Sequence, residues 1–394
     1  LMGDAGIDFF AGRYSIGVWF WETSRFPDVN LNGFHFVDEV WVASEFVGAA
    51  VAAATWKPVL VVPLPVEEPF QPRLARADLG LPEGFLFLFS FDFLSAFERK
   101  NPTALVEAFT TAFAPGEGPN LVIKSINGHR KPSKLEQLRR AAGGRPDIHL
   151  LDGYVSAEEK DAMMASCDCY VSLHRSEGFG LTMAEAMSYA RPVIATGYSG
   201  NLEFMDEANS YLVPHELIRI PDDSAYPPDT EWADPDVAAA AGLMRTVYER
   251  PDEARARGER AREDILRRFT VERTAEFLSS RLSEIGARRM QAWSPAGDPR
   301  IPLMQIAAEV SKGIGGDMRL GAQGRGPAAL VRRFLLRALW PYLDEQHRLN
   351  AAVLEALSAF QRSRDDELQR LARLEASPRD GKALPEGGHA RAEE

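Results

Sequence analysis

The stretch CYVSLHRSEGFGLTMAEAMSYARPVIAT, residues 169–196, decides the fold. It begins with the apolar run CYVSLH and ends with the apolar run PVIAT, and the segment before that last run has the composition of a helix. Short, continuous apolar strands separated by helices are typical of a parallel sheet that is covered on both faces. The sequence therefore predicts a doubly wound α/β domain.

The same alternation extends in both directions from this stretch. Further strands are predicted at FLFLFSF (85–91), LVIKS (121–125), IHLLDG (148–153) and SYLVP (210–214), with helices at 101–113, 133–142 and 156–167. The last of these helices begins with Ser156 and has Glu159 three residues on, which is a capping-box signature. Residues 233–286 predict a run of helices broken at Pro251 and at Phe269-Thr270.

A shorter α/β pattern precedes this domain. SIGVWFW (15–21), EVWVAS (39–44) and PVLVVP (58–63) predict strands, and a helix is expected over about 45–54. Some 80 residues are few for a complete domain, which usually has about 100–200. Since the first residue is also Leu1, we expect the first half of this domain to be missing.

Composition and charge narrow the class of protein. The chain has 394 residues, of which 45% are hydrophobic and 26% charged, an ordinary soluble globular profile. Its formal charge of −12 argues against nucleic acid as the partner. Cys167 and Cys169 are too close in the chain for a disulfide between them to stabilise the fold. We expect both to be reduced thiols that pack in the core, in a reducing, cytoplasmic compartment. No apolar run is long enough to span a membrane, and nothing resembles a secretory leader.

The loop RSEGFGLTMAEAM (175–187) follows a predicted strand. Ligands of open α/β sheets bind beyond the carboxyl ends of the strands. The helix that starts here offers its first free N–H groups at Gly180, Leu181 and Thr182, and with the helix dipole they suit a phosphate. Gly178 and Gly180 carry no side chain, so we expect the backbone to approach the ligand closely there.

Two carboxylates flank this turn. Glu177 and Glu185 do not suit a bare diphosphate, because like charges repel. They do suit hydroxyl groups, which donate strong charge-assisted hydrogen bonds to a carboxylate. A diphosphate with a hydroxyl-bearing ring on each side is a nucleotide sugar, so the spacing predicts that ligand.

The stretch resembles the glutamate-seven-glutamate motif of retaining, GT-B-fold glycosyltransferases of family 4, also called group 1. The chain is family-like throughout 152–205 and looks like bacterial polysaccharide-biosynthesis members. The resemblance implies that Glu177 contacts the donor sugar and Glu185 binds the ribose. It also implies that the backbone of Gly178 and of Phe179 to Leu181 holds sugar and phosphate. The implied fold is GT-B-like, with two doubly wound Rossmann-type domains.

A basic pair lies after the first strand of the same domain, in FDFLSAFERKNP (91–102). Relatives place an Arg/Lys pair on the diphosphate here, and Arg99 and Lys100 fit that role of neutralising the departing nucleoside diphosphate. The alternative is two solvated residues at a helix N-terminus, where the dipole disfavours cations. We therefore expect Glu177, Arg99 and Lys100 to be the catalytic residues.

Other segments of the domain are weaker candidates. In relatives the base lies against the loop after the third strand, here Gly153, Tyr154 and Val155. Lys124 ends the neighbouring strand, and Ser199-Gly200-Asn201 follows a later one. Both can line the same cleft, and a structural role is as compatible with the sequence.

The stretch IGVWFWETSRFPDVNLNGFHFVDEVWVASEFV (16–47) resembles the later part of the acceptor domain in polysaccharide-type members. Many relatives carry a histidine near the sugar in this domain. Here Trp21-Glu22 follows the relevant strand, so that histidine is absent, replaced by Glu22, or elsewhere. We expect His35 to be a partly buried structural residue.

The sequence shows no convincing motif for a dinucleotide, a P-loop phosphate site or a metal ion. No Gly-x-Gly-x-x-Gly follows a strand, and GAQGRG (321–326) lacks the Lys-Ser/Thr of a P-loop. The segment Asp234-Pro235-Asp236 imitates a metal-binding Asp-x-Asp, but it precedes a polyalanine helix, so helix capping explains it better. The seven histidines show no metal-ligand spacing. We expect neither a metal nor a cofactor besides the donor.

The resemblance gives a layout of five parts. We expect a partial acceptor-side α/β domain (1–78), a nucleotide-sugar binding domain with closing helices (79–287), a linker (288–326), a helical tail (327–375) and a disordered end (376–394). The tail begins with PAALVRRFLLRALWPYL (327–343), which can lie on an anionic membrane surface or pack on the enzyme or on another helix, including that of a second copy.

We therefore expect a metal-independent, retaining hexosyltransferase that uses a UDP- or GDP-sugar. Its acceptor would be the hydroxyl of a glycan or a lipid-linked glycan, in the cytoplasm or at the inner face of the membrane. Two alternatives stay open: another GT-B enzyme such as a sugar-nucleotide epimerase or a phosphorylase, and a non-catalytic scaffold that keeps a relict donor site.

Overall fold

The computed structural model of the protein describes residues 10, 13–69, 72–221, 226–227 and 229–292, all within one compact unit of the chain. The expected tail at 327–375, the expected disordered end and the linker beyond residue 292 lie outside the described residues. The layout of five parts stays a prediction.

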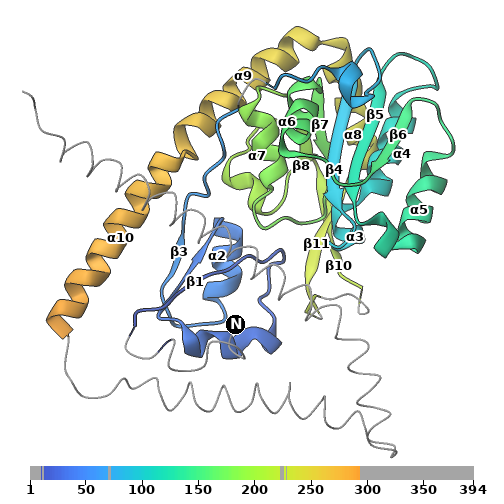
Figure 1. The fold of residues 1–394 in the computed structure, drawn as a ribbon. Coiled ribbons are helices and arrows are strands. Elements are labelled where there is room, and N and C mark those ends of the chain that lie inside the picture. The colour runs from blue at the N-terminus through green and yellow to red at the C-terminus, as the bar shows by residue number, and fades with distance from the viewer. Residues whose placement is uncertain (1–9, 11–12, 70–71, 222–225, 228, 293–394) are drawn as a thin grey trace, which may run out of the picture. The chain divides into compact units, whose positions relative to one another are not determined.

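Two parallel sheets organise the described residues (Figure 1). The smaller sheet has the order β1-β2-β3 and consists of β1 (Ile16–Val18), β2 (Glu39–Val42) and β3 (Val59–Val61). The 3-10 helix η2 (Asp28–Phe36) and the helix α2 (Glu45–Ala52) lie between these strands in the chain. The strand predicted over 15–21 ends early, because the aromatic residues that follow it pack on one another: Trp19 stacks on Phe26 with ring centroids 5.4 Å apart.

The larger sheet has six parallel strands in the order β6-β5-β4-β7-β8-β9. They are β4 (Leu86–Asp92), β5 (Asn120–Ile126), β6 (Ile148–Asp152), β7 (Cys169–Ser172), β8 (Val193–Thr196) and β9 (Tyr211–Val213). The doubly wound prediction is therefore confirmed. The chain runs outward in one direction from β4 to β6 and then in the other from β7 to β9, so the strand order reverses between β4 and β7.

Helices cover both faces of this sheet (Figure 1). On one face lie α4 (Pro102–Ala112), α5 (Pro132–Ala142) and α8 (Val237–Glu249), and on the other lie α6 (Ala157–Ser166), α7 (Leu181–Ser188) and α9 (Pro251–Arg268). The remaining segments are α3 (Phe97–Lys100), η3 (Arg76–Leu79), η4 (Gly128–Arg130), η5 (Gly200–Glu203) and α10 (Val271–Ala292).

The predicted helix signals hold at particular residues. Ser156 Oγ accepts from the backbone N–H of Glu159 at 3.1 Å, and Glu159 Oε2 accepts from that of Ser156 at 2.7 Å, which completes the capping box. Pro251 opens α9, and Phe269 separates α9 from α10, as predicted. α10 continues to Ala292, into the expected linker, because residues 288–292 contain neither Gly nor Pro.

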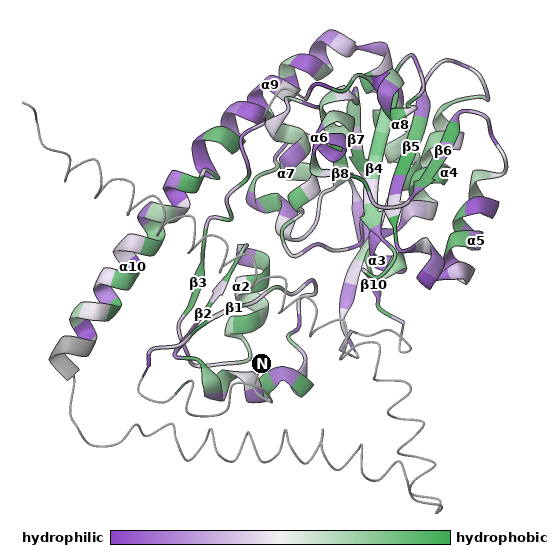
Figure 2. Ribbon diagram, viewed as in Figure 1, coloured by the Kyte–Doolittle hydropathy of each residue, from purple (hydrophilic) through white to green (hydrophobic). Residues whose placement is uncertain are grey.

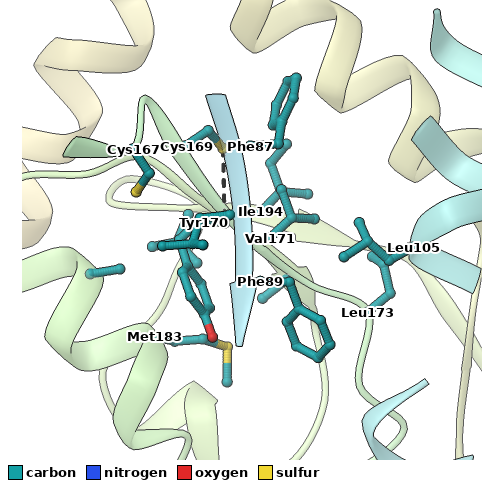
Figure 3. Packing of buried hydrophobic residues seen from close by; sticks show 14 of the residues in the cluster. Phe87, Phe89, Leu105, Cys167, Cys169, Tyr170, Val171, Leu173, Met183 and Ile194 are labelled. Carbon is teal, nitrogen blue, oxygen red and sulfur yellow. Dashed lines mark hydrogen bonds between the residues drawn. The ribbon is translucent and has the colours of Figure 1, made fainter. Parts of the chain in front are cut away.

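The core lies between the six strands and their helices. Figure 2 shows hydrophobic residues concentrated on the central strands. Figure 3 shows the middle of this core, where Phe87 and Phe89 of β4 lie beside Val171 of β7. Cys167 and Cys169 are free and fully buried thiols, which confirms their predicted packing role.

A β-hairpin was not predicted from the sequence. Antiparallel strands β10 (His215–Arg219) and β11 (Glu231–Pro235) pair within a segment that is mostly polar and carries no clear strand signal. Asp234 therefore lies in a strand. Asp236 Oδ1 accepts from the N–H of Ala239 at 2.9 Å and caps α8, so the capping interpretation is confirmed for Asp236.

Candidate functional site

The predicted catalytic residues meet where the strand order reverses. β4 and β7 are hydrogen-bonded neighbours, and the chain leaves them in opposite directions across the sheet. Loops after two such strands diverge and leave a crevice at their carboxyl ends, which is where open α/β sheets bind ligands. The segment after β4 carries Arg99 and Lys100 on α3, and the segment after β7 carries Glu177.

Three charged side chains form a compact cluster at this point. Lys100 Nζ lies 2.5 Å from Glu177 Oε1, and Arg99 Nη1 lies 3.1 Å from Glu177 Oε2. Arg99 also donates to the backbone oxygen of Ser176 at 2.7 Å. The exposed fraction is 11% for the Glu177 side chain, 17% for Lys100 and only 4% for Arg99. Arg99 is therefore placed to hold the loop, while Lys100 is the more accessible cation.

The cluster keeps Glu177 ionised. Burial alone would raise the pKa of this carboxyl, but the charges of Lys100 and Arg99 outweigh burial and lower the pKa to about 2. Burial lowers the pKa of Lys100 as well, although Glu177 opposes that change. A carboxylate held ionised with two cations beside it is suited to accept hydrogen bonds from sugar hydroxyls.

The N-terminal sheet contributes Glu22 to the same place. Its carboxylate lies 3.9 Å from Arg99 Nη2, and its backbone oxygen accepts a hydrogen bond from Ser176 Oγ. The prediction that Glu22 stands on the acceptor side stays open, but the side chain is brought to the predicted site. His35 is half-buried on η2, as expected.

The glycines of the loop serve packing within the protein. A Cβ on Gly178 would lie 2.4 Å from the backbone oxygen of Trp21. Gly180 has a φ of 94°, in the left-handed region, and a Cβ there would meet Met183 Cε at 2.4 Å. Neighbouring protein atoms thus fill the space that a side chain would need at both glycines, and close approach of the backbone to a ligand stays a prediction.

Several residues that support this loop were missed or left undecided by sequence reasoning. Ser44 Oγ donates to the Gly178 backbone oxygen at 2.6 Å and also caps α2. Ser199 Oγ accepts a hydrogen bond from the backbone N–H of Glu177 at 2.8 Å. The backbone N–H of Gly200 donates to the backbone oxygen of Glu177 at 2.9 Å. Ser199 and Gly200, predicted as alternatives lining the cleft, thus hold Glu177 through its backbone.

The hairpin supplies an aromatic residue that the sequence did not single out. Tyr226 lies between two tryptophans, with ring centroids 5.8 Å from Trp21 and 6.0 Å from Trp232. Burial raises the pKa of its hydroxyl, which also hydrogen-bonds to Arg99. Tyr226 follows the segment PDDSA (221–225) and precedes Pro227, so no periodic pattern marks it, and only the fold brings it to the site.

The predicted diphosphate and ribose positions lie on α7. Leu181 and Thr182 form its first turn, where helix amides lack partners within the helix. Glu185 lies one turn further on, and its Oε1 is 2.8 Å from Nζ of Lys160 on α6. Phe179, predicted to contribute its backbone, packs its ring on Phe204, with centroids 4.9 Å apart.

The predicted base loop lies at the carboxyl end of β6. Tyr154 is 73% exposed, and its hydroxyl donates to Asn127 Oδ1 at 3.0 Å. Val155 is partly exposed. Lys124 is buried and donates a hydrogen bond to the backbone oxygen of Gly153, so it supports the base loop through its backbone.

Two further searches concern only the described residues. Among them, no three or more His, Cys, Asp or Glu side chains are grouped so as to hold a metal ion. None of the helices within the described part of the chain is both long and apolar enough to cross a membrane.

Sequence comparison matches part of the chain to a known family. Residues 76–218 match the family Glycosyl transferases group 1, and this region contains the loops after β4 and β7 together with α7. Residues 76–218 form a group 1 glycosyltransferase domain. The predicted family resemblance is confirmed.

Individual proteins are also similar to this chain. Over 115 residues the chain is 28% identical to the lipopolysaccharide glucosyltransferase WaaG of Escherichia coli (strain K12), a match that spans 29% of each chain. The sucrose-phosphate synthase of Thermosynechococcus elongatus has a similar structure, with a TM-score of 0.54, 20% identity, and coverage of 69% of this chain and 68% of that one. Anabaena HepE, solved with UDP and glucose, gives a TM-score of 0.52, 17% identity, and coverage of 66% and 68%. These similarities confirm the predicted GT-B-like fold.

Proposed function

We propose that the protein is a retaining, metal-independent glycosyltransferase that moves a hexose from a UDP- or GDP-sugar to an acceptor hydroxyl. The observation that carries the proposal is the buried cluster of Glu177, Arg99 and Lys100 at the switch point of a group 1 domain. HepE, with a similar fold, is solved with UDP and glucose, which supports a nucleotide sugar as the ligand.

In this proposal, different residues bind the diphosphate, the ribose and the hexose of the donor. The amides of Leu181 and Thr182 at the start of α7 face the diphosphate, and Glu185 accepts hydrogen bonds from the ribose. Lys100 is paired with Glu177 but is more exposed than Arg99. When the donor enters, the ammonium of Lys100 moves towards the phosphate, and the freed lone pairs of Glu177 accept hydrogen bonds from the hydroxyl groups of the sugar.

Transfer requires no side-chain nucleophile in this proposal. The bond between the anomeric carbon and the leaving phosphate oxygen breaks, and the acceptor oxygen bonds to the same face of that carbon. The proton of the acceptor hydroxyl passes to the departing phosphate. Lys100 stabilises the negative charge that develops on the phosphate, which is the type of electrostatic assistance that contributes most in such sites.

The acceptor side is the N-terminal sheet. Glu22 lies within 3.9 Å of Arg99 and is the carboxylate of that sheet nearest the cluster among the ion pairs described. We propose that it binds or orients an acceptor hydroxyl. The similarity to a lipopolysaccharide glucosyltransferase favours a glycan or lipid-linked glycan as acceptor, used in the cytoplasm or at the inner face of the membrane.

Calorimetry with UDP, GDP and their hexose derivatives tests the donor site, and NMR of the product tests retention at the anomeric carbon. We expect one nucleotide series to bind wild-type protein, Glu185→Ala to weaken it at least tenfold, and chelation of metal to leave transfer unchanged. Glu276→Ala, at an exposed pair with Arg273 on α10, is the matched control and should bind normally. If neither series binds, the donor-site proposal fails. Binding without transfer to any acceptor favours the scaffold alternative.

A further inference from the structure

A lysine outside the family motif contacts the carboxylate assigned to the ribose. Lys160 lies one turn into α6, and its Nζ is 2.8 Å from Oε1 of Glu185 on α7. α6 begins directly after the loop of residues 153–155, which is proposed to face the base. Lys160 therefore stands between the expected positions of the base and of the ribose.

The pair is partly shielded from solvent. The Glu185 side chain is 21% exposed and the Lys160 side chain 45% exposed, and α6 packs against α7 along this side of the sheet. Nζ also lies 3.4 Å from Asp161 Oδ1, so the ammonium has carboxylates on two sides. Ion pairs with this much exposure contribute little to the stability of the fold. The consequence to look for is the orientation of Glu185 rather than the stability of the fold.

A fixed carboxylate matters for a sugar that carries neighbouring hydroxyls. A carboxylate has two oxygens and about four lone-pair positions. With Oε1 held by Lys160, the plane of the Glu185 carboxylate is set, and Oε2 together with the remaining lone pair of Oε1 faces outward in a defined direction. A 2′-hydroxyl and a 3′-hydroxyl can then donate to the same group, whereas a freely rotating glutamate would lose entropy for each contact.

We propose that Lys160 is a positioning residue that makes this site select ribonucleoside diphosphates over their 2′-deoxy counterparts. The inference rests on the proposed function, because it takes Glu185 as the ribose ligand. Lys160 acts through Glu185 and need not touch the nucleotide. A hydrogen bond to a charged group usually contributes enough to change affinity about tenfold, which corresponds to about 1.4 kcal/mol.

The test measures dissociation constants by calorimetry for UDP and 2′-deoxy-UDP, and for GDP and 2′-deoxy-GDP. Wild-type protein should prefer the ribo form at least tenfold in the series that it binds. Lys160→Met should reduce that preference to about twofold while leaving the affinity for the deoxy form within about twofold. Lys160→Arg, which keeps the charge and the donors, should retain most of the preference. Glu185→Gln, which removes the charged carboxylate itself, should give the lowest preference for the ribo form among the variants.

Arg255→Met is the matched control, because it also removes a cation from an exposed ion pair, the one that Arg255 forms with Asp252 within α9. It should leave both affinities unchanged, and thermal unfolding of all variants checks that they fold. Equal weakening of ribo and deoxy forms by Lys160→Met would overturn the proposal, since it would indicate a phosphate contact. An unchanged preference in Lys160→Met would overturn it as well. Failure of wild-type protein to bind any of the four nucleotides would instead refute the proposed function.

Discussion

Replacing Glu177 by glutamine should destabilise the protein in a pH-dependent way. The substitution keeps the size of the side chain but leaves Arg99 and Lys100 without their shared carboxylate in a buried cluster. The pKa of Glu177 falls from its ordinary value of 4.5 to about 2 in the folded protein. Such a change corresponds to roughly 3 kcal/mol of folding free energy at neutral pH. Removal of one partner from a buried pair usually costs a similar amount, about 3–5 kcal/mol.

The sign of the pH dependence follows from the direction of this change. Because folding lowers the pKa, the contribution of Glu177 is complete above pH 4.5 and is lost as the pH falls towards 2. Urea unfolding of wild type and Glu177→Gln should therefore differ by roughly 3 kcal/mol at pH 7 and at pH 5, and by about 1.4 kcal/mol at pH 3.

Glu276→Gln on α10 is the control for this measurement, since the side chain is 68% exposed and should change stability by less than about 0.5 kcal/mol. A difference below about 1 kcal/mol for Glu177→Gln at pH 7 would refute the reasoning. So would a difference that is the same at pH 7 and pH 3, because the lost interaction would then not be that of an ionised carboxylate.

Two further substitutions test packing and charge within the fold, by measurements of stability. Gly178→Ala places a methyl group 2.4 Å from the Trp21 backbone oxygen and should cost about 1–3 kcal/mol, measured as a lower midpoint of thermal unfolding; an unchanged midpoint would contradict the close contact. Arg281→Met leaves Glu39, which is fully buried, without the guanidinium that binds both of its oxygens, and should cost about 3–5 kcal/mol in urea unfolding. The double variant with Glu39→Gln should recover part of that loss, and complete additivity would contradict the pairing.

The larger sheet was predictable because each strand is buried on both faces. FLFLFSF and CYVSLH read as continuous apolar runs, and helix signals such as the capping box of Ser156 lie close to where the structure has them. The glutamate spacing likewise placed Glu177 and Glu185 on a loop and on the helix that follows it. These features depend on neighbouring residues in the chain, which a sequence displays directly.

Features that depend on distant residues were not predictable. Tyr226 reaches Arg99 across more than a hundred residues, and nothing local to either marks the contact. Lys160 pairs with Glu185 only because α6 and α7 pack side by side. The β10–β11 hairpin was missed for another reason: β10 is mostly exposed, and the buried residues of β11 do not alternate with exposed ones, so neither strand shows the period of two that identifies a half-buried strand.

The contact between Gly178 and the backbone of Trp21 has a consequence for protein engineering. In the loop at 175–180, the backbone of Trp21 occupies the space where a side chain on Gly178 would lie, and Ser44 donates a hydrogen bond to the same loop. An exchange that replaces residues 1–78 alone would bring the backbone of a foreign turn against Gly178. A transplanted N-terminal part should therefore travel together with the loop at 175–180, as one cassette.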